Sequence, residues 1–207
     1  MSLPFYQNDH WKLSSTLVNQ LQQLDWKQLP VTSLINRPTL AKMILQGWSK
    51  KEYTLRGFFQ SYGLFLQNTA NLFNLKLPTD IENNVIDHFH KRLPGVPIPI
   101  FRIQAIFNGH CVPIHRDKTM RASMVFPLSN HQGSWTRFYS SSCANRHLID
   151  PATCMLTHQV EITQPTLLNV DICHDVWSST MYTKHTPRLS LTAKWPNTSY
   201  QQLINLL

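Results

Sequence analysis

Glycine is scarce in this chain of 207 residues, which has six, at positions 47, 57, 63, 95, 109 and 133. No two of them have the spacing of a dinucleotide-binding fingerprint, and none precedes the Lys-Ser/Thr pair that a P-loop requires. The two commonest glycine-rich nucleotide sites are therefore excluded.

Cysteine and long apolar runs are also scarce. The four cysteines are widely spaced with no CxxC pair, which argues against a zinc knuckle or a disulfide scaffold and predicts free thiols in a reducing compartment. The N-terminus lacks the basic start and apolar run of a secretory signal, and no stretch approaches the roughly 18 apolar residues needed to cross a bilayer. We expect a soluble, cytoplasmic protein without a membrane partner.

Acidic residues are few, with 11 Asp and Glu against 19 Lys and Arg, and the net charge is +8. This balance favours anionic partners. The surplus is spread evenly over both halves of the chain with no basic arm, so nucleic-acid binding is not favoured. In residues 101–207, five of the nine basic residues lie in the two segments that hold the candidate site described below, which predicts a pocket for carboxylates. They are Arg116, Lys118, Arg121, Lys184 and Arg188.

Helical patterns dominate the first half of the chain. A serine cap at position 14 or 15 predicts a short helix that ends before Pro30, and Pro38 predicts the start of a second. Residues 54–75 show an apolar stripe at helical spacing, wide enough to pack on a sheet. Thr79 with Glu82 matches a capping box for a further helix.

After Pro94 the pattern changes to short, β-rich segments separated by turn-forming residues. The predicted strands cover residues 98–107, 122–128, 135–140, 155–162, 166–172 and 188–195. Strands at this spacing suggest an antiparallel sandwich or barrel. We therefore expect one domain over 1–207, with a mainly helical layer at 1–95 packed on a β-structured core at 96–207.

Three residues of the second half form a candidate metal site. His115 and Asp117 are two apart at a predicted strand end, so an imidazole and a carboxylate point to the same face. His174 follows the next-to-last predicted strand, and 175–186 is expected to be a loop. Two histidines and one carboxylate form the facial arrangement of non-haem Fe(II) oxygenases. On the last strand Arg188 and Ser190 share a face, and together suit a terminal carboxylate.

The order HxD, then His, then RxS resembles the Fe(II)/2-oxoglutarate-dependent dioxygenases, in particular small members with a prolyl-hydroxylase-like layout. The resemblance covers roughly residues 98–195. It implies an α+β fold with a double-stranded β-helix (jelly-roll) core and N-terminal helices packed on the sheet. It further implies Fe(II) on His115, Asp117 and His174, with 2-oxoglutarate held by Arg188 and Ser190 and consumed with O₂. The activity would be hydroxylation of a C–H bond of a protein side chain, an amino acid or a nucleobase, with release of succinate and CO₂.

Other readings of the same residues stay open. Lys184 is a rival partner for the carboxylate of 2-oxoglutarate, while Gln104 and Asn169 are candidates for further contacts with it. Four aromatic residues could wall a substrate pocket or simply be core, namely Trp135, Tyr139, Trp177 and Trp195. The cluster of Asp87, His88 and His90 is expected to be a solvated helix face rather than a metal site. At the level of function, the alternative is a catalytically silent barrel that serves as a binding or scaffold module.

Overall fold

The computed structural model describes residues 3–35, 71–107, 109–117, 119–140, 153–183 and 186–207. Its helices are α1 (Ser15–Gln23), α4 (Thr79–Arg92) and α5 (Tyr200–Ile204), with short 3-10 turns η1 (Asp9–Trp11) and η2 (Trp26–Gln28). Its strands are β1 (Phe5–Gln7), β2 (Val31–Ile35), β3 (Asn71–Leu75), β4 (Ile100–Phe107), β5 (Gly109–His115), β6 (Ala122–Ser129), β7 (Ser134–Ser140), β8 (Met155–Glu161), β9 (Thr166–Leu168), β10 (Cys173–Tyr182) and β11 (Arg188–Trp195).

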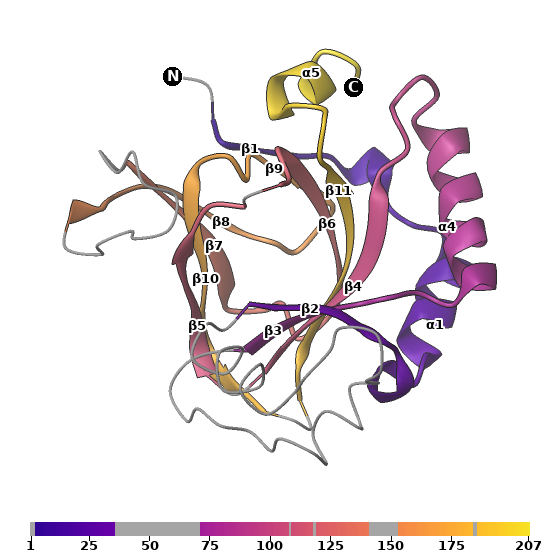
Figure 1. The fold of residues 1–207 in the computed structure, drawn as a ribbon, viewed down its shortest axis with the longest axis horizontal. Helices are drawn as coiled ribbons and strands as arrows, with labels where there is room; N and C mark the ends of the chain where they lie inside the picture. The colour runs from indigo at the N-terminus through magenta and orange to yellow at the C-terminus, as the bar shows by residue number, and fades with distance from the viewer. Residues whose placement is uncertain (1–2, 36–70, 108, 118, 141–152, 184–185) are drawn as a thin grey trace.

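The described strands form two antiparallel sheets. Seven strands pair in the order β1-β9-β6-β11-β4-β3-β2, and four pair in the order β5-β10-β7-β8. Figure 1 shows the four-stranded sheet on the left and the larger sheet to its right, with α1 and α4 beyond the larger sheet. The fold thus consists mostly of antiparallel sheets with few helices, and one helical layer covers the outer face of the larger sheet.

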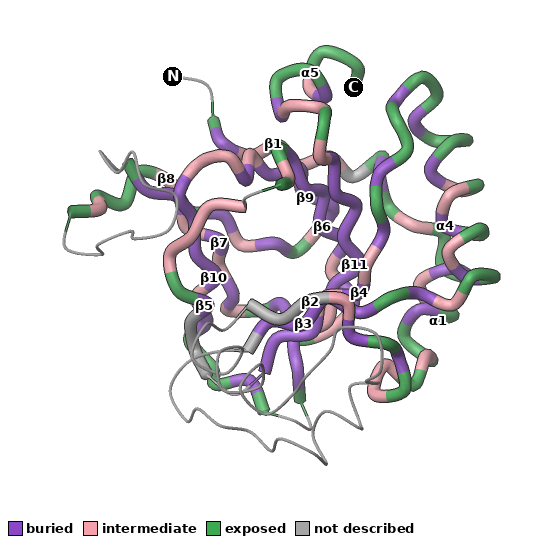
Figure 2. The backbone as a smooth tube through the Cα atoms, viewed as in Figure 1, coloured by how far each residue is buried: buried purple, intermediate pink, exposed green. Residues whose placement is uncertain are grey.

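Alternation along β11 separates the core from the site. Successive side chains of a strand point to opposite faces. Trp195 is 1% exposed and packs against Phe89 of α4, with ring centroids 5.8 Å apart. Arg188 and Lys194 point the other way and line the space between the sheets. The central strands are accordingly buried on both faces (Figure 2), with an apolar side toward the helices and a polar side toward the second sheet.

The first residues of α1 and α4 agree with the predicted helices, but one of the two predicted N-caps is wrong. Ser14 accepts a hydrogen bond from the Leu17 N–H and caps α1, as expected. At α4 the predicted capping box is absent, because Pro78 takes the N-cap position and Thr79 is already helical. Pro78 has no side-chain acceptor to offer the first turn.

Two expected segments differ from the structure. The helix predicted over residues 54–75 is wrong at its end, since Asn71–Leu75 is strand β3, paired between β2 and β4. Its first part, and the helix expected after Pro38, lie outside the described residues. The expected loop at 175–186 is also wrong, because β10 continues through Tyr182. Besides helices, the described part of residues 1–95 therefore supplies three strands.

The remaining strand predictions agree with the structure to within a few residues, and β11 covers the predicted range. No helix within the described ranges is long and apolar enough to cross a membrane.

Candidate metal centre

His115, Asp117 and His174 come together at one end of the four-stranded sheet. His115 is the last residue of β5, and it lies directly opposite His174 in the antiparallel register of β5 with β10. Opposed residues of neighbouring strands place their side chains in contact, and the two imidazole rings have centroids 4.4 Å apart. Strand pairing thus brings together two histidines that are far apart in the sequence.

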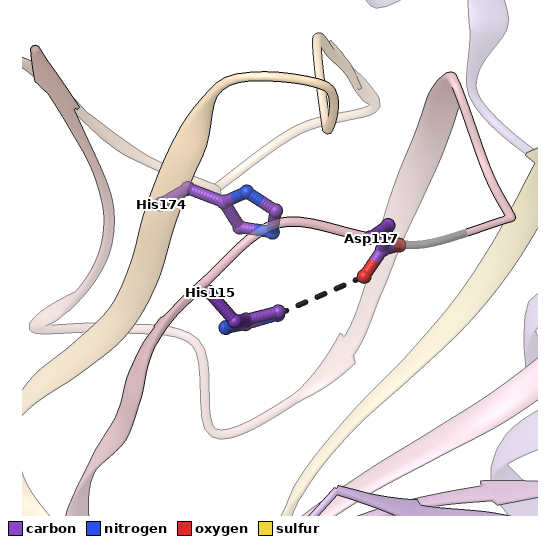
Figure 3. Close-up of side chains that lie close together, drawn as sticks. All are labelled: His115, Asp117 and His174. Carbon is purple, nitrogen blue, oxygen red and sulfur yellow. Dashed lines mark ion pairs between the residues drawn. The ribbon is translucent and has the colours of Figure 1, made fainter. Parts of the chain in front are cut away.

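Asp117 completes the group from the segment that leaves β5. Its backbone N–H donates to the Val170 carbonyl at 3.2 Å, which fixes the chain beyond the strand end. Asp117 Oδ1 then lies 3.7 Å from His115 Nε2 (Figure 3). One ligand atom from each of the three residues lies within 4.8 Å of the other two. Within the described part of the chain this is the one such group of metal-binding side chains.

Hydrogen bonds on the far side of each ring set the tautomers of the histidines. His115 Nδ1 lies 2.7 Å from the Pro113 carbonyl, and His174 Nδ1 lies 2.8 Å from the Ile172 carbonyl. A carbonyl oxygen only accepts, so Nδ1 carries the proton in both rings and Nε2 keeps its lone pair. Metal-binding histidines are oriented in this way by backbone carbonyls.

The electrostatics keep these ligands in the protonation states that a metal needs. Burial, and then the neighbouring His115, lower the pKa of His174 to about 4, so its ring is neutral at pH 7. Burial alone would raise the pKa of Asp117, but the Lys194 ammonium and the two imidazoles outweigh burial and hold it below its usual value. The donor set is two imidazoles and one carboxylate, which fits a divalent iron site with coordination positions left open.

The strand that carries His174 is fixed from its opposite face. Asp175 points away from the cavity and is 1% exposed. It accepts hydrogen bonds from Arg137 Nε and from the Tyr139 hydroxyl, both at 2.9 Å. A paired, hydrogen-bonded buried carboxylate of this kind joins β10 to β7 beside His174, and it holds the ligand-bearing backbone in place.

The metal-binding group opens into a cavity between the two sheets. The space measures about 450 Å³ including the part open to solvent. It is lined by Leu72, Gln104, His115, Asp117, Ser123, Val125, Thr136, Ile162, Leu168, Val170, His174, Val176, Arg188 and Lys194. Apolar and polar walls alternate, because the inward faces of both sheets contribute.

Arg188 is a buried cation in this cavity wall, with 2% of its surface exposed. Its Nε donates to Nδ1 of His131 at 3.3 Å, and among the described residues no carboxylate neutralises it. Burial lowers the pKa of Arg188 to about 10, so the guanidinium is still charged at pH 7. A buried charge without a counter-ion is costly, so the site is built for an anionic ligand.

His131 links the two residues expected to hold that anion. Because its Nδ1 accepts from Arg188, its Nε2 carries the proton, and Nε2 lies 2.8 Å from the Leu189 carbonyl and 3.2 Å from Ser190 Oγ. Burial, followed by the Arg188 charge, holds the pKa of His131 well below its ordinary value. The neutral ring thus orients the guanidinium and engages a lone pair of the Ser190 hydroxyl, which leaves the hydroxyl proton for a ligand.

Three buried hydroxyls lack a partner among the described residues: Ser134 Oγ, Thr136 Oγ1 and Tyr182 Oη. Thr136 lines the cavity. Tyr182 lies close enough to Arg188 to affect the pKa of the guanidinium. Unsatisfied buried polar groups are rare and costly, and a polar ligand in the cavity would satisfy the Thr136 hydroxyl.

Of the other residues proposed from the sequence, some agree with the prediction and some do not. Gln104 lines the cavity as expected, whereas Asn169 does not, because its side-chain oxygen accepts from the Asp171 N–H in a turn. Lys184 lies outside the described residues. Asp87 and His90 are exposed on α4, as expected of a solvated face. His88 differs from this expectation, because it is half-buried and its Nε2 is buried without a partner among the described residues.

None of the four aromatic candidates lines the cavity. Trp135, Tyr139 and Trp177 occupy the alternate positions of β7 and β10 that face away from it, with the two tryptophan rings 5.4 Å apart. Trp195 is core and donates from Nε1 to the Pro97 carbonyl at 2.7 Å. Their structural role is packing on the outer sides of the sheets.

Sequence reasoning missed two residues of the site, His131 and Lys194. His131 sits in the turn between β6 and β7, where no local pattern marks it. Lys194 continues the alternation of Arg188 and Ser190 along β11, and that period-two spacing was the signal that could have found it. Of the basic residues expected around the pocket, Arg116 instead donates from Nε to Cys173 Sγ at 3.0 Å.

No protein-family model and no curated protein sequence matches the chain. Among solved structures it is similar to the ribosomal oxygenase YcfD of Escherichia coli, with a TM-score of 0.41 and 12% identity over 68% of this chain and 36% of that one. The chain thus spans about a third of the length of YcfD.

Two further similar structures are enzymes of nogalamycin biosynthesis described as non-haem and alpha-ketoglutarate-dependent. The epimerase SnoN has a TM-score of 0.38 and 12% identity over 87% of this chain and 83% of that one. The carbocyclase SnoK has a TM-score of 0.41 and 9% identity over 91% and 86%. The likenesses are distant, and they assign no activity to the chain.

Proposed function

We propose that this protein is an Fe(II)- and 2-oxoglutarate-dependent dioxygenase that hydroxylates a C–H bond of its substrate. We also interpret the two facing antiparallel sheets as a double-stranded β-helix. One observation carries the proposal. A two-histidine, one-carboxylate group and a buried, unneutralised guanidinium line the same cavity. The metal site and the carboxylate clamp are the two parts that this chemistry requires.

In this proposal Nε2 of His115, Nε2 of His174 and a carboxylate oxygen of Asp117 hold the iron. Both imidazoles present their lone pairs because the backbone carbonyls hold the Nδ1 protons. Three protein ligands leave the remaining coordination positions for 2-oxoglutarate and O₂. The bound iron would supply the redox chemistry that splits O₂, with one oxygen atom going to succinate and the other to the substrate.

Arg188, Ser190 and His131 would hold the far carboxylate of 2-oxoglutarate. The guanidinium contacts His131 through Nε, so its terminal nitrogens would be available to the carboxylate as a bidentate donor. The Ser190 hydroxyl accepts from the His131 ring and has its own proton to donate. Burial of the clamp excludes water from the ion pair, which strengthens the interaction. Lys184, the rival partner from the sequence, is not needed for this role.

The test is succinate formation from Fe(II), 2-oxoglutarate and O₂, with and without candidate substrates. His115→Ala serves as the matched inactive control. We expect succinate from the wild type above the level of the control, and a further increase when a true substrate is present. Equal succinate from both proteins across substrate libraries would contradict the proposal. The protein would then fit the alternative of a catalytically silent binding module.

A metal-binding measurement distinguishes the dioxygenase from the silent binding module without any measurement of turnover. Mn(II) is a redox-silent substitute for Fe(II), and its binding is measured by the loss of the free-ion electron paramagnetic resonance signal. An enzyme should bind one Mn(II) and lose that binding in Asp117→Ala. A silent module that has lost the site would show the same weak binding in both proteins.

A further inference from the structure

We propose that Lys194 binds an anionic group of the substrate, a carboxylate or a phosphate, beside the metal centre. This inference rests on the proposed function and adds the substrate class to it.

Lys194 lies at the metal end of the cavity. It shares the inward face of β11 with Arg188, six residues away, which is about 20 Å along a strand. Its side chain is 10% exposed, and its Nζ lies 3.8 Å from Asp117 Oδ2. In the register of β11 with β6 it is opposite Ser123, whose side chain also lines the cavity. An ammonium and a hydroxyl are thus adjacent on the wall next to the metal ligands.

The charges of the cavity do not balance without a further anion. Histidines aside, the described lining residues that are charged at neutral pH are Asp117, Arg188 and Lys194. The far carboxylate of 2-oxoglutarate neutralises Arg188. Around the metal, the two charges of Fe(II) and the one of Lys194 face one carboxylate from Asp117 and one from the 2-oxo acid end. One positive charge is left over at a buried position, and an anionic substrate group would neutralise it.

A purely structural role for Lys194 makes a different prediction. Lys194 faces Oδ2 of Asp117, while Oδ1 faces His115. If Lys194 only positioned the carboxylate, its removal would weaken metal binding. If it is a surplus cation awaiting the substrate, its removal relieves repulsion with the metal, and metal binding stays equal or becomes tighter.

The experiment uses the whole protein loaded with Mn(II), measured first without 2-oxoglutarate and then saturated with it. The paramagnetic enhancement of ³¹P relaxation is measured for inorganic phosphate, and that of ¹H relaxation for acetate. The variants are Lys194→Gln and Lys194→Arg. Lys91→Gln, which removes an equal charge from the exposed face of α4, is the matched control. Mn(II) and 2-oxoglutarate affinities are measured for every protein.

We expect enhancement for at least one ion in the wild type and in Lys91→Gln. It should fall about tenfold or more in Lys194→Gln and stay within about threefold in Lys194→Arg, because the charge contact is retained. Enhancement of phosphate alone or of acetate alone supports the inference and identifies which anion the site prefers.

Three results would overturn the inference while leaving the proposed function intact. They are no enhancement in the wild type, equal enhancement in Lys194→Gln, or enhancement that 2-oxoglutarate abolishes, which indicates direct binding to the metal. Weaker Mn(II) binding in Lys194→Gln would also overturn it, in favour of the positioning role. A wild type that binds neither Mn(II) nor 2-oxoglutarate would refute the proposed function, and the charge surplus with it.

Discussion

Replacement of His131 by leucine tests whether the carboxylate clamp works as a unit. Leucine has a similar size but neither accepts from Arg188 Nε nor donates to the Leu189 carbonyl or to Ser190 Oγ, the contacts that His131 makes at 3.3, 2.8 and 3.2 Å. Arg188 is buried, so water does not replace the ring at its Nε. The guanidinium then loses the contact that fixes the orientation of its plane.

The expected size follows from the lost hydrogen bonds. A hydrogen bond to a charged group contributes about 1.5–3 kcal/mol, so we expect the free energy of unfolding to fall by roughly 2 kcal/mol. That corresponds to a drop in Tm of about 4–8 °C in a chain of this size. If about 1.4 kcal/mol of the loss falls on ligand binding, the Kd for 2-oxoglutarate rises about tenfold.

Calorimetric titration of the Mn(II)-loaded protein with 2-oxoglutarate measures this effect. His131→Gln is the rescue variant, because its amide both accepts and donates, and His90→Leu on the exposed face of α4 is the matched control. Mn(II) affinity should be unchanged throughout, since His131 does not contact the metal ligands. A Kd for 2-oxoglutarate in His131→Leu within twofold of the wild type, with normal Mn(II) binding, would refute the role of His131.

Three further outcomes are expected. Arg188→Gln should weaken 2-oxoglutarate binding by roughly a hundredfold in calorimetry while Mn(II) still binds, because a buried charge-assisted pair is lost. Loss of Mn(II) binding together with 2-oxoglutarate binding would mean that the variant is misfolded. Since the pKa of His131 is depressed in the folded state, the unfolded chain takes up that proton first as the pH falls. The metal-free protein should therefore keep this contribution to stability above about pH 6.5 and lose about 1.4 kcal/mol per pH unit below it. In denaturant titrations, the slope of the free energy of unfolding against pH should be smaller in His131→Gln by the amount that one proton contributes. An unchanged slope would contradict the depressed pKa. Phe89→Ala should cost about 3–5 kcal/mol by removing the ring between Phe101 and Trp195, and a loss below 1 kcal/mol in denaturant titration would show that α4 does not depend on this packing.

The grouping of His115, Asp117 and His174, and the place of Arg188 in the same cavity, could be predicted from local patterns. His115 and Asp117 have the two-residue spacing of a strand end, and Arg188 begins the strand with the clearest alternation. His131 could not be found in this way, because its partners lie 57 and 59 residues away along the chain. Contacts of this range depend on sheet pairing, which a single sequence does not specify.

The error at β3 has a similar cause. The apolar residues at the end of the predicted helix continue a helical spacing, so local reasoning extends the helix into them. The structure instead pairs Asn71–Leu75 with strands on both sides, and tertiary pairing overrides the local preference. The loop expected from Asp175 onward is wrong for the same reason, because the pairing of β10 with β5 and β7 continues the strand to Tyr182.

The opposition of His115 and His174 has a consequence for the lifetime of the protein. A divalent ion bound to both would act as a cross-link between β5 and β10, strands that are joined by a long stretch of chain. Because the ion binds the folded state, a concentration a hundredfold above its Kd would stabilise that state by about 2.7 kcal/mol. The unfolded fraction open to proteases would fall about a hundredfold. The supply of that ion would then affect how much of this protein persists.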